Sequence, residues 1–491
     1  MNPFLMCDYY KTCHAQMLPE GITKSVSYFI PRGNRIPGWD KAVFFGLRGF
    51  IEEYLVDTFK NEFFRRKWHS LGTELTLALG ATLGKPDCDR FIERVHSLWN
   101  LARLPIEIAA LPEGSHVPMG VPMFSITNTH PDFAWLPQFL ESLISCEMWH
   151  SIVVATVADK FKALVNAEYR KTSDADPDYA LSLFSMRGEE SIQSATKSGA
   201  AWATSFIPCA TVSTAEYLHR YYGVNYGETI RGSPSTEHAV MCSNAAVDGD
   251  EVTFIRRILT DIYPNTSFSI VLDSYDYWHM VKEVLPALKK DILAHNGCML
   301  IRGDSGNPVD VVTETVFELW KIFGGTVNSK GYKVLDRHVK AIYGDQITLE
   351  RAAVIYRTLR REGFAADNVA LGVGSYSTQA VKVDGEHYPF TRDTFNMAIK
   401  CTYVEVDGKP YNVYKAPKGA DIKRSPKGCV WVYEDDGRYI AKDGHNWNDT
   451  EALYYSMDRC PLRPVFVNGK TLYGEEDTLK GIRRRLNNYQ E

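Results

Sequence analysis

The feature that most constrains the fold of this chain is a pattern that recurs between about residues 180 and 400. A short run of apolar, β-prone residues ends in polar or glycine residues, and a stretch with helical periodicity follows. The acidic residues after three successive runs lie roughly 30 to 40 positions apart, the spacing of β-α units with parallel strands. Because parallel strands end on one edge of a sheet, the pattern predicts an α/β fold with a single binding edge. The apolar runs are 267–272, 298–301, 338–343 and 368–371.

The two ends of the chain have a mixed pattern. Residues 25–30 and 104–111 alternate like strands, whereas 41–63 and 133–169 have helical periodicity. Strand-like runs return after about residue 400, at 428–433 and 438–441, and we expect this tail to rejoin the amino-terminal part. A length of 491 residues suggests two domains. We expect residues 1–150 and 389–491 to form an α+β domain, and 151–388 to form an α/β domain with the active site.

Composition excludes several classes of protein. A formal charge of −5 gives no basic field, so nucleic acid is an unexpected partner. No apolar run reaches the length of about 18 residues that a membrane span needs, and the start of the chain lacks the pattern of a secretory signal. The ten cysteines are scattered without a Cys-x-x-Cys pair, which is typical of reduced, buried thiols. We therefore expect a cytoplasmic protein without membrane contact.

The strongest local signal is Arg302-Gly-Asp-Ser-Gly-Asn-Pro308, which follows a predicted strand. Its glycines let backbone N–H groups approach an anion, Arg302 offers forked donors, and Asp304 can hold ribose hydroxyls or a magnesium-bound ligand. The same residues also favour a simple turn that opens a helix. The arginine at the strand end favours a phosphorylated ligand.

Three other places can carry chemistry. His238 lies in a stretch of small residues, where it can act as a base, as a nucleophile toward a phosphoryl donor, or as a hydrogen-bonding group oriented by Glu237 or another carboxylate. Phe184 precedes Arg187 by three positions, so the pair could stack a flat heterocycle beside an anion, although such a phenylalanine is more often part of a core. Cations follow the glycine-rich turn after 371, where surface charge is the default interpretation; they are Arg392, Lys400 and Lys415. The sequence contains no His-Glu-x-x-His, Gly-x-Ser-x-Gly or Walker A motif.

Taken together, these segments resemble the nicotinamide phosphoribosyltransferase family of type II phosphoribosyltransferases, and the resemblance runs nearly from end to end. Each motif is weak alone, but their order is specific to the family. The matching segments are Asp8-Tyr-Tyr-Lys-Thr-Cys-His14, Ser27-Tyr-Phe-Ile-Pro-Arg32, Leu104-Pro-Ile-Glu-Ile108, Leu111-Pro-Glu-Gly114, Thr236-Glu-His238, Asp273-Ser-Tyr-Asp276, Asp304-Ser-Gly-Asn-Pro308, Asn328-Ser-Lys-Gly-Tyr-Lys333, Tyr343-Gly-Asp345 and Thr391-Arg-Asp393.

The resemblance implies an irregular (β/α) barrel with a second α+β domain formed by both chain ends. It implies that nicotinamide and phosphoribosyl pyrophosphate give nicotinamide mononucleotide and pyrophosphate in NAD biosynthesis or salvage. It also implies a homodimer with shared active sites, Mg²⁺ carried through the pyrophosphate rather than on a protein metal site, and ATP as the phosphoryl donor to His238.

Site residues also follow from the resemblance. The base should lie between Phe184 and Tyr10 of the partner subunit, with Arg302 and Ser269 near its edge. Arg187 should contact the base or a phosphate. The remaining expectations are Asp304, Gly344 and Asp345 at the ribose; Gly374, Ser375 and Arg392 at the 5′-phosphate, helped by the partner's Lys400 and the partner's Lys415; Arg32 on the pyrophosphate side; and Asp8 and Asp273 among the other substrate-binding residues.

The chain departs from the family pattern mainly at the base end. Ala210 stands where the family has an aspartate that accepts from the carboxamide, Arg231 adds a charge before His238, and Ser182-Leu183 replaces a His-Asp pair. The loop between Tyr376 and Phe390 is longer than usual, which is a surface insertion or an adaptation to a larger donor. Three alternatives therefore stand beside nicotinamide phosphoribosyl transfer. They are nicotinate as the base, an ADP-ribose pyrophosphate donor that gives NAD directly, and a catalytically silent nucleotide-binding relative.

Overall fold

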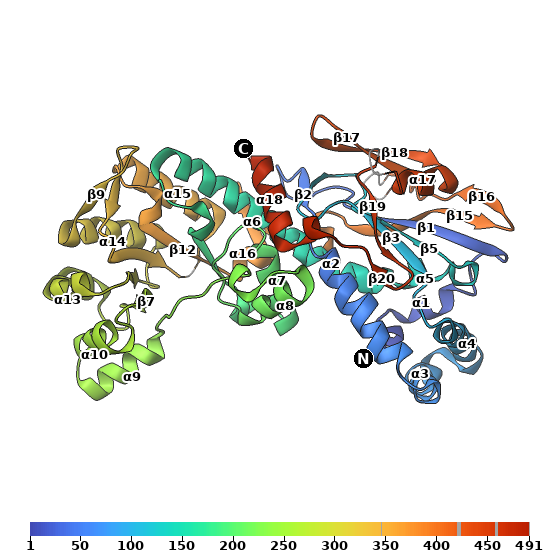
Figure 1. Ribbon diagram of the computed structural model, residues 1–491, viewed down its shortest axis with the longest axis horizontal. Coiled ribbons are helices and arrows are strands. Elements are labelled where there is room, and N and C mark those ends of the chain that lie inside the picture. The colour runs from blue at the N-terminus through green and yellow to red at the C-terminus, as the bar shows by residue number, and fades with distance from the viewer. Residues whose placement is uncertain (345, 420–423, 457–459, 491) are drawn as a thin grey trace.

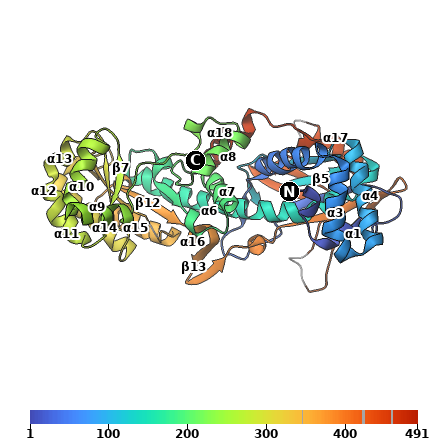
Figure 2. The same cartoon turned by 90° about the horizontal axis from the view of Figure 1, so that it is seen from below.

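The computed structural model describes residues 1–344, 346–419, 424–456 and 460–490. The molecule is elongated, with one sheet toward each end, and the long helix α6 (Glu141–Thr172) runs through the middle between them (Figure 1). The view from below shows the same arrangement, with α6 along the long axis (Figure 2). Among the described residues, no helix is long and apolar enough to cross a membrane.

One sheet is parallel throughout, as the recurring pattern predicted. Its strand order is β6-β12-β11-β8-β7, and every neighbouring pair is parallel. Single bridges continue the sheet beyond its edges, joining Leu183 to Cys209, Pro208 to Arg231, and Ser235 to Ser269. These bridges lead from β6 round toward β7, so the sheet curves into an irregular barrel. The strands are β6 (Leu181–Phe184), β7 (Phe268–Val271), β8 (Met299–Arg302), β11 (Val339–Tyr343) and β12 (Val369–Gly374).

Helices follow the strands of this barrel. The predicted helices after β8 and β11 are confirmed as α14 and α15, whereas the predicted helix between 277 and 290 is divided into short pieces. The helices of this part are α7 (Ile192–Trp202), α8 (Val212–Tyr222), α9 (His238–Asp248), α10 (Glu251–Arg257), α11 (Tyr277–His279), α12 (Leu285–Ala287), α13 (Lys289–Ala294), α14 (Pro308–Phe323), α15 (Leu349–Arg361) and α16 (Tyr376–Gln379). Two hairpins accompany them, β9 (Gly325–Val327) with β10 (Lys333–Leu335), and β13 (Ala380–Val383) with β14 (Glu386–Pro389).

The second sheet is antiparallel and contains strands from both ends of the chain, which confirms the predicted second α+β unit. Its order is β16-β15-β1-β5-β3-β19-β20, so that β15 pairs with β1 and β19 with β3. The strands are β1 (Ile22–Ile30), β3 (Ile106–Ala110), β5 (Phe124–Asn128), β15 (Ala398–Val406), β16 (Lys409–Asn412), β19 (Arg463–Val467) and β20 (Lys470–Thr471). Around it lie α1 (Tyr9–His14), α3 (Trp68–Leu83), α4 (Lys85–Leu101), α5 (Leu136–Phe139), α17 (Trp447–Tyr454) and the hairpin of β17 (Cys429–Asp435) with β18 (Arg438–His445). The last helix, α18 (Leu479–Gln490), packs in the middle of the molecule against α6, α7 and α8.

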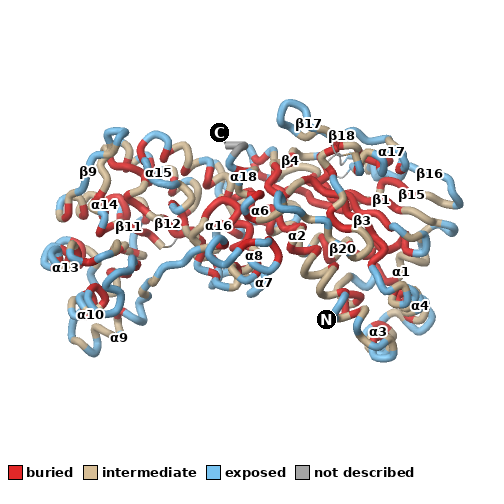
Figure 3. The backbone as a smooth tube through the Cα atoms, viewed as in Figure 1, coloured by how far each residue is buried: buried red, intermediate tan, exposed pale blue. Residues whose placement is uncertain are grey.

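Burial follows this division into two sheets. The central strands of both sheets and much of α6 are buried, whereas the outer hairpins and the outer faces of α9 and α13 are exposed (Figure 3). In β3 and β5 every residue is buried, so both faces of the antiparallel sheet are covered near its centre.

The prediction of a helix over 41–63 is wrong at its start. Residues 41–43 form strand β2 (Lys41–Val43), paired with β4 (His116–Pro118), and the helical run begins only at α2 (Leu47–Phe50). Gly46 has φ of +106°, which breaks the strand, and the Glu113 carboxylate accepts from the N–H groups of Gly46 and Arg48. This cap comes from a residue distant in the sequence, so local periodicity could not reveal it. The run continues to Phe64 with π-helical hydrogen bonding.

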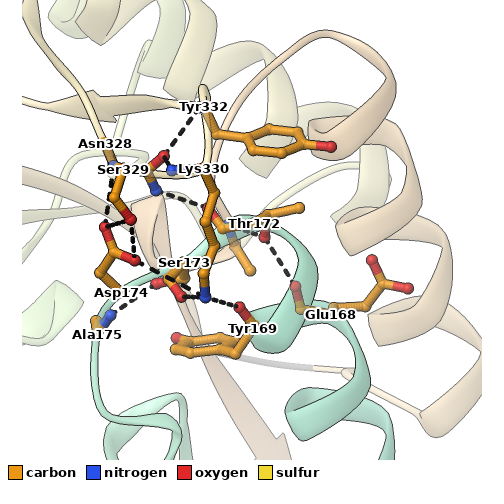
Figure 4. A network of polar contacts seen from close by, with 11 residues as sticks. Glu168, Tyr169, Thr172, Ser173, Asp174, Ala175, Asn328, Ser329, Lys330 and Tyr332 are labelled. Atoms are coloured by element: carbon orange, nitrogen blue, oxygen red, sulfur yellow. Dashed lines mark hydrogen bonds and ion pairs between the residues drawn. The ribbon is translucent and has the colours of Figure 1, made fainter.

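The motif at 328–333 holds the end of α6 against the barrel (Figure 4). Lys330 Nζ donates to the carbonyl of Tyr169, 3.1 Å away, and to that of Ser173. Asn328 Nδ2 donates to Thr172 O at 2.8 Å. Since the last carbonyls of a helix have no partner within the helix, these donors complete its carboxyl end. The motif therefore has a structural role at the end of the barrel opposite to the strands' carboxyl edge.

We predict that Lys330→Met lowers the free energy of unfolding by about 1–3 kcal/mol, because it removes a charged donor from two helix carbonyls. Lys321→Met is the matched control, since Lys321 is 68% exposed and, among the residues that the structure describes, pairs only with Glu318 on its own helix. Its effect should stay within about 0.5 kcal/mol. Urea unfolding curves of the three proteins give the comparison, and equal stability of the two variants would contradict the role of Lys330.

Candidate active site

The loops after the parallel strands meet at one edge, and carboxylates connect them. The backbone N–H of Asp304, after β8, donates to Asp273 Oδ2, after β7, at 3.0 Å. The N–H of Gly344, after β11, donates to Asp304 Oδ1 at 3.3 Å. Three consecutive β-α units thus share one polar cluster, as the spacing of the acidic residues predicted. Asp345, expected in the same cluster, lies outside the described residues.

Arg302 is held in place from several sides. Its Nη1 donates to Ser235 Oγ at 3.2 Å, its Nη2 donates to the carbonyl of Thr236 at 3.0 Å, and its Nε lies 3.2 Å from Asp304 Oδ2. Burial raises the pKa of Asp304, and the guanidinium of Arg302 opposes this rise. A Cβ on Gly344 would lie 3.0 Å from Asp304 Oδ1, so glycine permits this close packing. Arginine and carboxylate are therefore fixed before any ligand arrives.

His238 begins α9 and faces the same cluster. Its Nε2 lies 3.0 Å from Asp273 Oδ1, and its side chain is 50% exposed, whereas that of Asp273 is 3% exposed. Burial raises the pKa of Asp273, but hydrogen bonds from Ser305, His238 and the Asp304 N–H outweigh it, so the pKa is lowered overall. Asp273 is thus an anion at neutral pH. The carboxylate that orients the histidine is Asp273 rather than its neighbour Glu237, and Nδ1 keeps its lone pair on a partly exposed ring.

Phe184 ends β6 next to two glycines. A Cβ on Gly372 would lie 2.7 Å from Phe184 Cδ2 and 2.8 Å from Gly344 Cα, so the ring packs directly on the backbone of β12 and β11. Phe184 is half-buried, and its strand partner is Gly374. The aromatic ring therefore belongs to the carboxyl edge and is not part of the deep core.

Other predicted residues line the same edge. Ser269 is buried, and its Oγ has no hydrogen-bond partner within the described ranges. Ser375 packs against Gly188, where a Cβ would come within 2.0 Å of its Oγ. Arg187 is exposed beside Phe184. The edge therefore combines an aromatic face, a free hydroxyl and a solvent-facing guanidinium.

A second polar group forms near the amino terminus. Asp8 Oδ2 accepts from Tyr10 Oη at 2.9 Å and from Ser142 Oγ at 2.6 Å, and these hydrogen bonds, that of Ser142 first, lower the pKa of Asp8. Arg392 lines the same hollow, which has a volume of about 610 Å³. Lys400 Nζ lies 3.3 Å from Oε1 of Glu141, which begins α6 and also lines the hollow. We call Asp8, Tyr10, Arg392 and Lys400 the amino-terminal group.

Arg32 lies beside Arg392 of this group, and Lys415 lies in the segment after β16. Arg32 Nε donates to Asn396 O at 3.1 Å. Burial lowers the pKa of Arg32, nearby Arg392 lowers it further, and Asp393 opposes both. Lys415 is exposed, and its backbone N–H donates to Ser425 Oγ at 2.8 Å. Arg32 and Arg392 are therefore close enough for their charges to interact.

The predicted residues therefore fall into two groups within one chain. Arg392 was expected beside Gly374 and Ser375, but it shares a hollow with Asp8 and Tyr10. Arg392 Nη2 instead donates to Asp393 Oδ1 at 2.7 Å, and within the described parts of the chain no hydrogen bond or ion pair joins Arg392 to Arg302 or Asp304. We call Asp273, Arg302, Asp304 and His238, with Phe184 beside them, the edge group. The edge group and the amino-terminal group each have their own set of contacts.

Sequence reasoning missed the residues that position Arg302. Ser235 and Thr236 supply its two acceptors, and Thr236 Oγ1 also accepts from the N–H of Val271 at 2.9 Å. The run of small residues before His238 was the available signal, but its bridge to β7 needs the folded barrel.

We predict that Gly372→Ala lowers the free energy of unfolding by about 1–3 kcal/mol, because its methyl group must displace Phe184 or the backbone of Gly344. Gly227→Ala is the control, since a Cβ there meets nothing within 4 Å. Chemical denaturation of both variants tests the packing, and an unchanged Gly372→Ala protein would contradict the close approach of β11, β12 and the ring.

Comparisons with known proteins match this chain to phosphoribosyltransferases over nearly its whole length. The family model described as "Nicotinate phosphoribosyltransferase (NAPRTase) family" matches residues 179–488, and "Nicotinamide phosphoribosyltransferase, N-terminal domain" matches residues 2–64. A nicotinamide phosphoribosyltransferase of Acinetobacter baylyi is 34% identical, with 99% of this chain and 97% of the relative covered. A nicotinamide phosphoribosyltransferase of Xanthomonas campestris pv. campestris is 33% identical, with 98% of this chain and 97% of the relative covered.

Solved structures support the fold. The nicotinate-nucleotide pyrophosphorylase of Pyrococcus furiosus covers 99% of this chain and 94% of its own, with a TM-score of 0.58 and 16% identity. The match to the human nicotinic acid phosphoribosyltransferase covers 98% of this chain and 92% of the human chain, with a TM-score of 0.56 and 15% identity.

Proposed function

Since this chain belongs to the nicotinate phosphoribosyltransferase family and is related along nearly its whole length to nicotinamide phosphoribosyltransferases, we propose that it makes nicotinamide mononucleotide and pyrophosphate from nicotinamide and phosphoribosyl pyrophosphate. The observation that carries this proposal is the connected edge group, in which Arg302, Asp304, Asp273 and His238 are joined by hydrogen bonds and an ion pair beside Phe184. Such a protein would act in NAD biosynthesis, in the cytoplasm.

The chemistry requires positioning more than acid–base catalysis. The pyridine nitrogen attacks the ribose C1 with its own lone pair while the bond from C1 to the pyrophosphate oxygen breaks, so no proton needs to be removed. Phe184 offers a face for the flat base, and Arg302 with the free Ser269 Oγ lies near its edge. Asp304 is placed to accept from the ribose hydroxyls and to stabilise the cationic character of the sugar. Arg187 is placed to contact the base or a phosphate.

His238 is placed to accept a phosphoryl group from ATP. Because Asp273 accepts from Nε2, the lone pair is on Nδ1, which can attack the terminal phosphorus of ATP as the bond to ADP breaks. Half of the side chain is exposed, so a nucleotide can approach it. The anionic Asp273 would stabilise the positive charge of the imidazole during the transfer.

Magnesium would be carried by the donor. No group of three or more His, Cys, Asp or Glu side chains suited to a metal occurs in the part of the chain that the structure describes. Asp273 is already occupied by donors, which fits diphosphate oxygens as the main ligands of the ion. Bound there, Mg²⁺ supplies charge neutralisation on the leaving pyrophosphate.

We propose a homodimer in which the amino-terminal group of one subunit completes the edge group of the other. Both groups carry exposed apolar side chains that suit an interface. Met186, Ile192 and Val212 are 45%, 66% and 82% exposed near the edge group. Tyr9, Tyr10 and Met17 are 50%, 57% and 73% exposed near Asp8. In this arrangement Tyr10 of the partner subunit faces Phe184 across the base. The 5′-phosphate has Gly374 and Ser375 on one side. On its other side are three cations of the second subunit, namely the partner's Arg392, the partner's Lys400 and the partner's Lys415. Arg32 would then reach the pyrophosphate side.

The residues near Phe184 favour a second candidate function, in which the base is nicotinate rather than nicotinamide. The N–H of Ala210 donates to Leu183 O at 3.0 Å, so Ala210 lies beside the strand of Phe184 without offering a carboxylate. The cation Arg231 is on the neighbouring segment. This charge pattern favours nicotinate as the base.

The hairpin β13–β14, which projects from the middle of the molecule just after Ser375, favours a donor larger than phosphoribosyl pyrophosphate (Figure 2). Tyr376 Oη and His387 Nδ1 lie 2.6 Å apart, so a hydrogen bond connects β14 to the segment that follows Ser375. An ADP-ribose pyrophosphate donor would give NAD directly.

We predict that the purified enzyme with Mg²⁺ and ATP converts nicotinamide and phosphoribosyl pyrophosphate to the mononucleotide. The assay presents nicotinamide with nicotinate, and phosphoribosyl pyrophosphate with the ADP-ribose donor, in competition. Asp304→Ala should lower kcat/KM on the order of 100-fold, whereas Arg392→Ala should mainly raise the donor KM. Asp310→Ala, an exposed substitution on α14, is the control. Tight ligand binding without turnover of any combination would instead identify a catalytically silent relative.

The shared site predicts complementation between Asp304→Ala and Arg392→Ala, measured at a donor concentration well below the KM of Arg392→Ala, where each variant alone has little activity. Mixed dimers of Asp304→Ala and Arg392→Ala chains contain one site with both native residues, so dissociation and reassociation should recover about a quarter of wild-type activity. Recovery is expected because half of the randomly paired dimers are mixed and each holds one intact site of two. If both residues served one site in the same chain, every site would keep one defect and no activity would return.

A further inference from the structure

Glu189 connects the turn that carries Arg187 to the turn that carries Ser375. It follows Arg187 by two positions in the turn after β6, and its side chain is partly buried. Its Oε1 accepts from Thr378 Oγ1 at 2.8 Å, in the segment after β12. Its Oε2 accepts from Ser194 Oγ at 3.1 Å, in the first turn of α7. One carboxylate therefore joins three segments at the carboxyl edge of the barrel.

Thr378 connects Glu189 to Ser375. It is fully buried and belongs to α16, which lies beside α6 and α7 in both Figure 1 and Figure 2. Its hydroxyl hydrogen is shared between Glu189 Oε1 and the carbonyl of Ser375, each 2.8 Å from Oγ1. Its N–H also donates to the Ser375 carbonyl, at 3.1 Å, and His150 Nε2 on α6 donates to the Thr378 carbonyl at 2.8 Å. The short segment from Ser375 to Thr378 is thus held by two residues that lie outside it.

Gly188 brings the same two turns into direct contact. A Cβ on Gly188 would lie 2.0 Å from Ser375 Oγ and 2.6 Å from Ser375 Cβ, so glycine is needed for the present position of the serine side chain. Gln379 Nε2 donates to the carbonyl of Gly188. The position of Ser375 therefore depends on the turn after β6.

The sign of the effect of Glu189 on a bound phosphate separates two roles. As a charge alone, a carboxylate near a phosphate repels it, and its removal would strengthen phosphate binding. As the partner of Thr378, it holds Ser375 in one conformation, and its removal would weaken phosphate binding because the turn loses its preorganisation. The hydrogen bonds described above favour the second role.

We propose that Glu189 is a positioning residue for the 5′-phosphate of the substrate, and that it acts through Thr378 on the turn of Gly374 and Ser375. This inference rests on the proposed function, since that function places the 5′-phosphate at this turn. Glu189 acts on the affinity for the phosphate group and not on the chemical step at the ribose C1.

The experiment compares two ligands by isothermal titration calorimetry of the full-length protein. They are nicotinamide mononucleotide and nicotinamide riboside, which lacks the 5′-phosphate. We expect Glu189→Ala to raise the dissociation constant of the mononucleotide about tenfold and to change that of the riboside less than about twofold. In steady-state assays the KM of phosphoribosyl pyrophosphate should rise, whereas kcat should change less than about threefold.

Three further variants isolate the hydrogen bonds. Glu189→Gln should bind the mononucleotide nearly as the wild type does, because its amide oxygen can accept from Thr378 and its amide N–H can donate to Ser194 Oγ. Thr378→Val should reproduce the loss, and combining it with Glu189→Ala should add little, since both remove the same contact. Glu190→Ala is the matched control, because Glu190 is exposed and has no hydrogen bond or ion pair with any residue that the structure describes.

Several results would overturn the positioning role. They are equal weakening of both ligands by Glu189→Ala, tighter binding of the mononucleotide by that variant, a Glu189→Gln protein as weak as Glu189→Ala, and additive losses from Glu189→Ala and Thr378→Val. A wild type that binds the mononucleotide no better than its variants would refute the role of Glu189 alone. A wild type that binds neither ligand would refute the proposed function, and the inference with it.

Discussion

The arrangement of the barrel depends on one constraint, which is that parallel strands deliver all their following loops to the same edge. Here this brings Asp273 and Asp304 close enough for the N–H of the second to donate to the carboxylate of the first. Like charges so near would repel, and the structure relieves the repulsion by placing His238 on one carboxylate and Arg302 on the other. The edge is therefore a balanced set of charges, formed before a substrate binds.

The second constraint is that the chain ends share one antiparallel sheet. Because β15 pairs with β1, Arg392 and Lys400 are brought close to Asp8 and Tyr10, although almost the whole chain lies between them. A reaction on a sugar diphosphate needs charge at both ends of its substrate. In the proposed homodimer, the amino-terminal group of a second copy of the chain would supply the cations for the edge group of the first.

The barrel could be predicted from the sequence because its signal is local and repeated. Each strand run ended in polar residues, and the runs 298–301 and 338–343 became β8 and β11 with the expected helices after them. The start of the 41–63 run could not be predicted, since Glu113 caps α2 from a distant loop. The position of Arg392 depends equally on a long-range strand pairing. The domain boundaries at 150 and 388 remain predictions, as do the roles of the individual site residues.

The most direct test of the account is a crystal structure of the protein with nicotinamide mononucleotide bound. We expect the pyridine ring to lie on Phe184, the ribose hydroxyls to contact Asp304, and the 5′-phosphate to reach Arg392 of the partner subunit. A nucleotide bound away from the edge group, or a phosphate held only by residues of one chain, would contradict it.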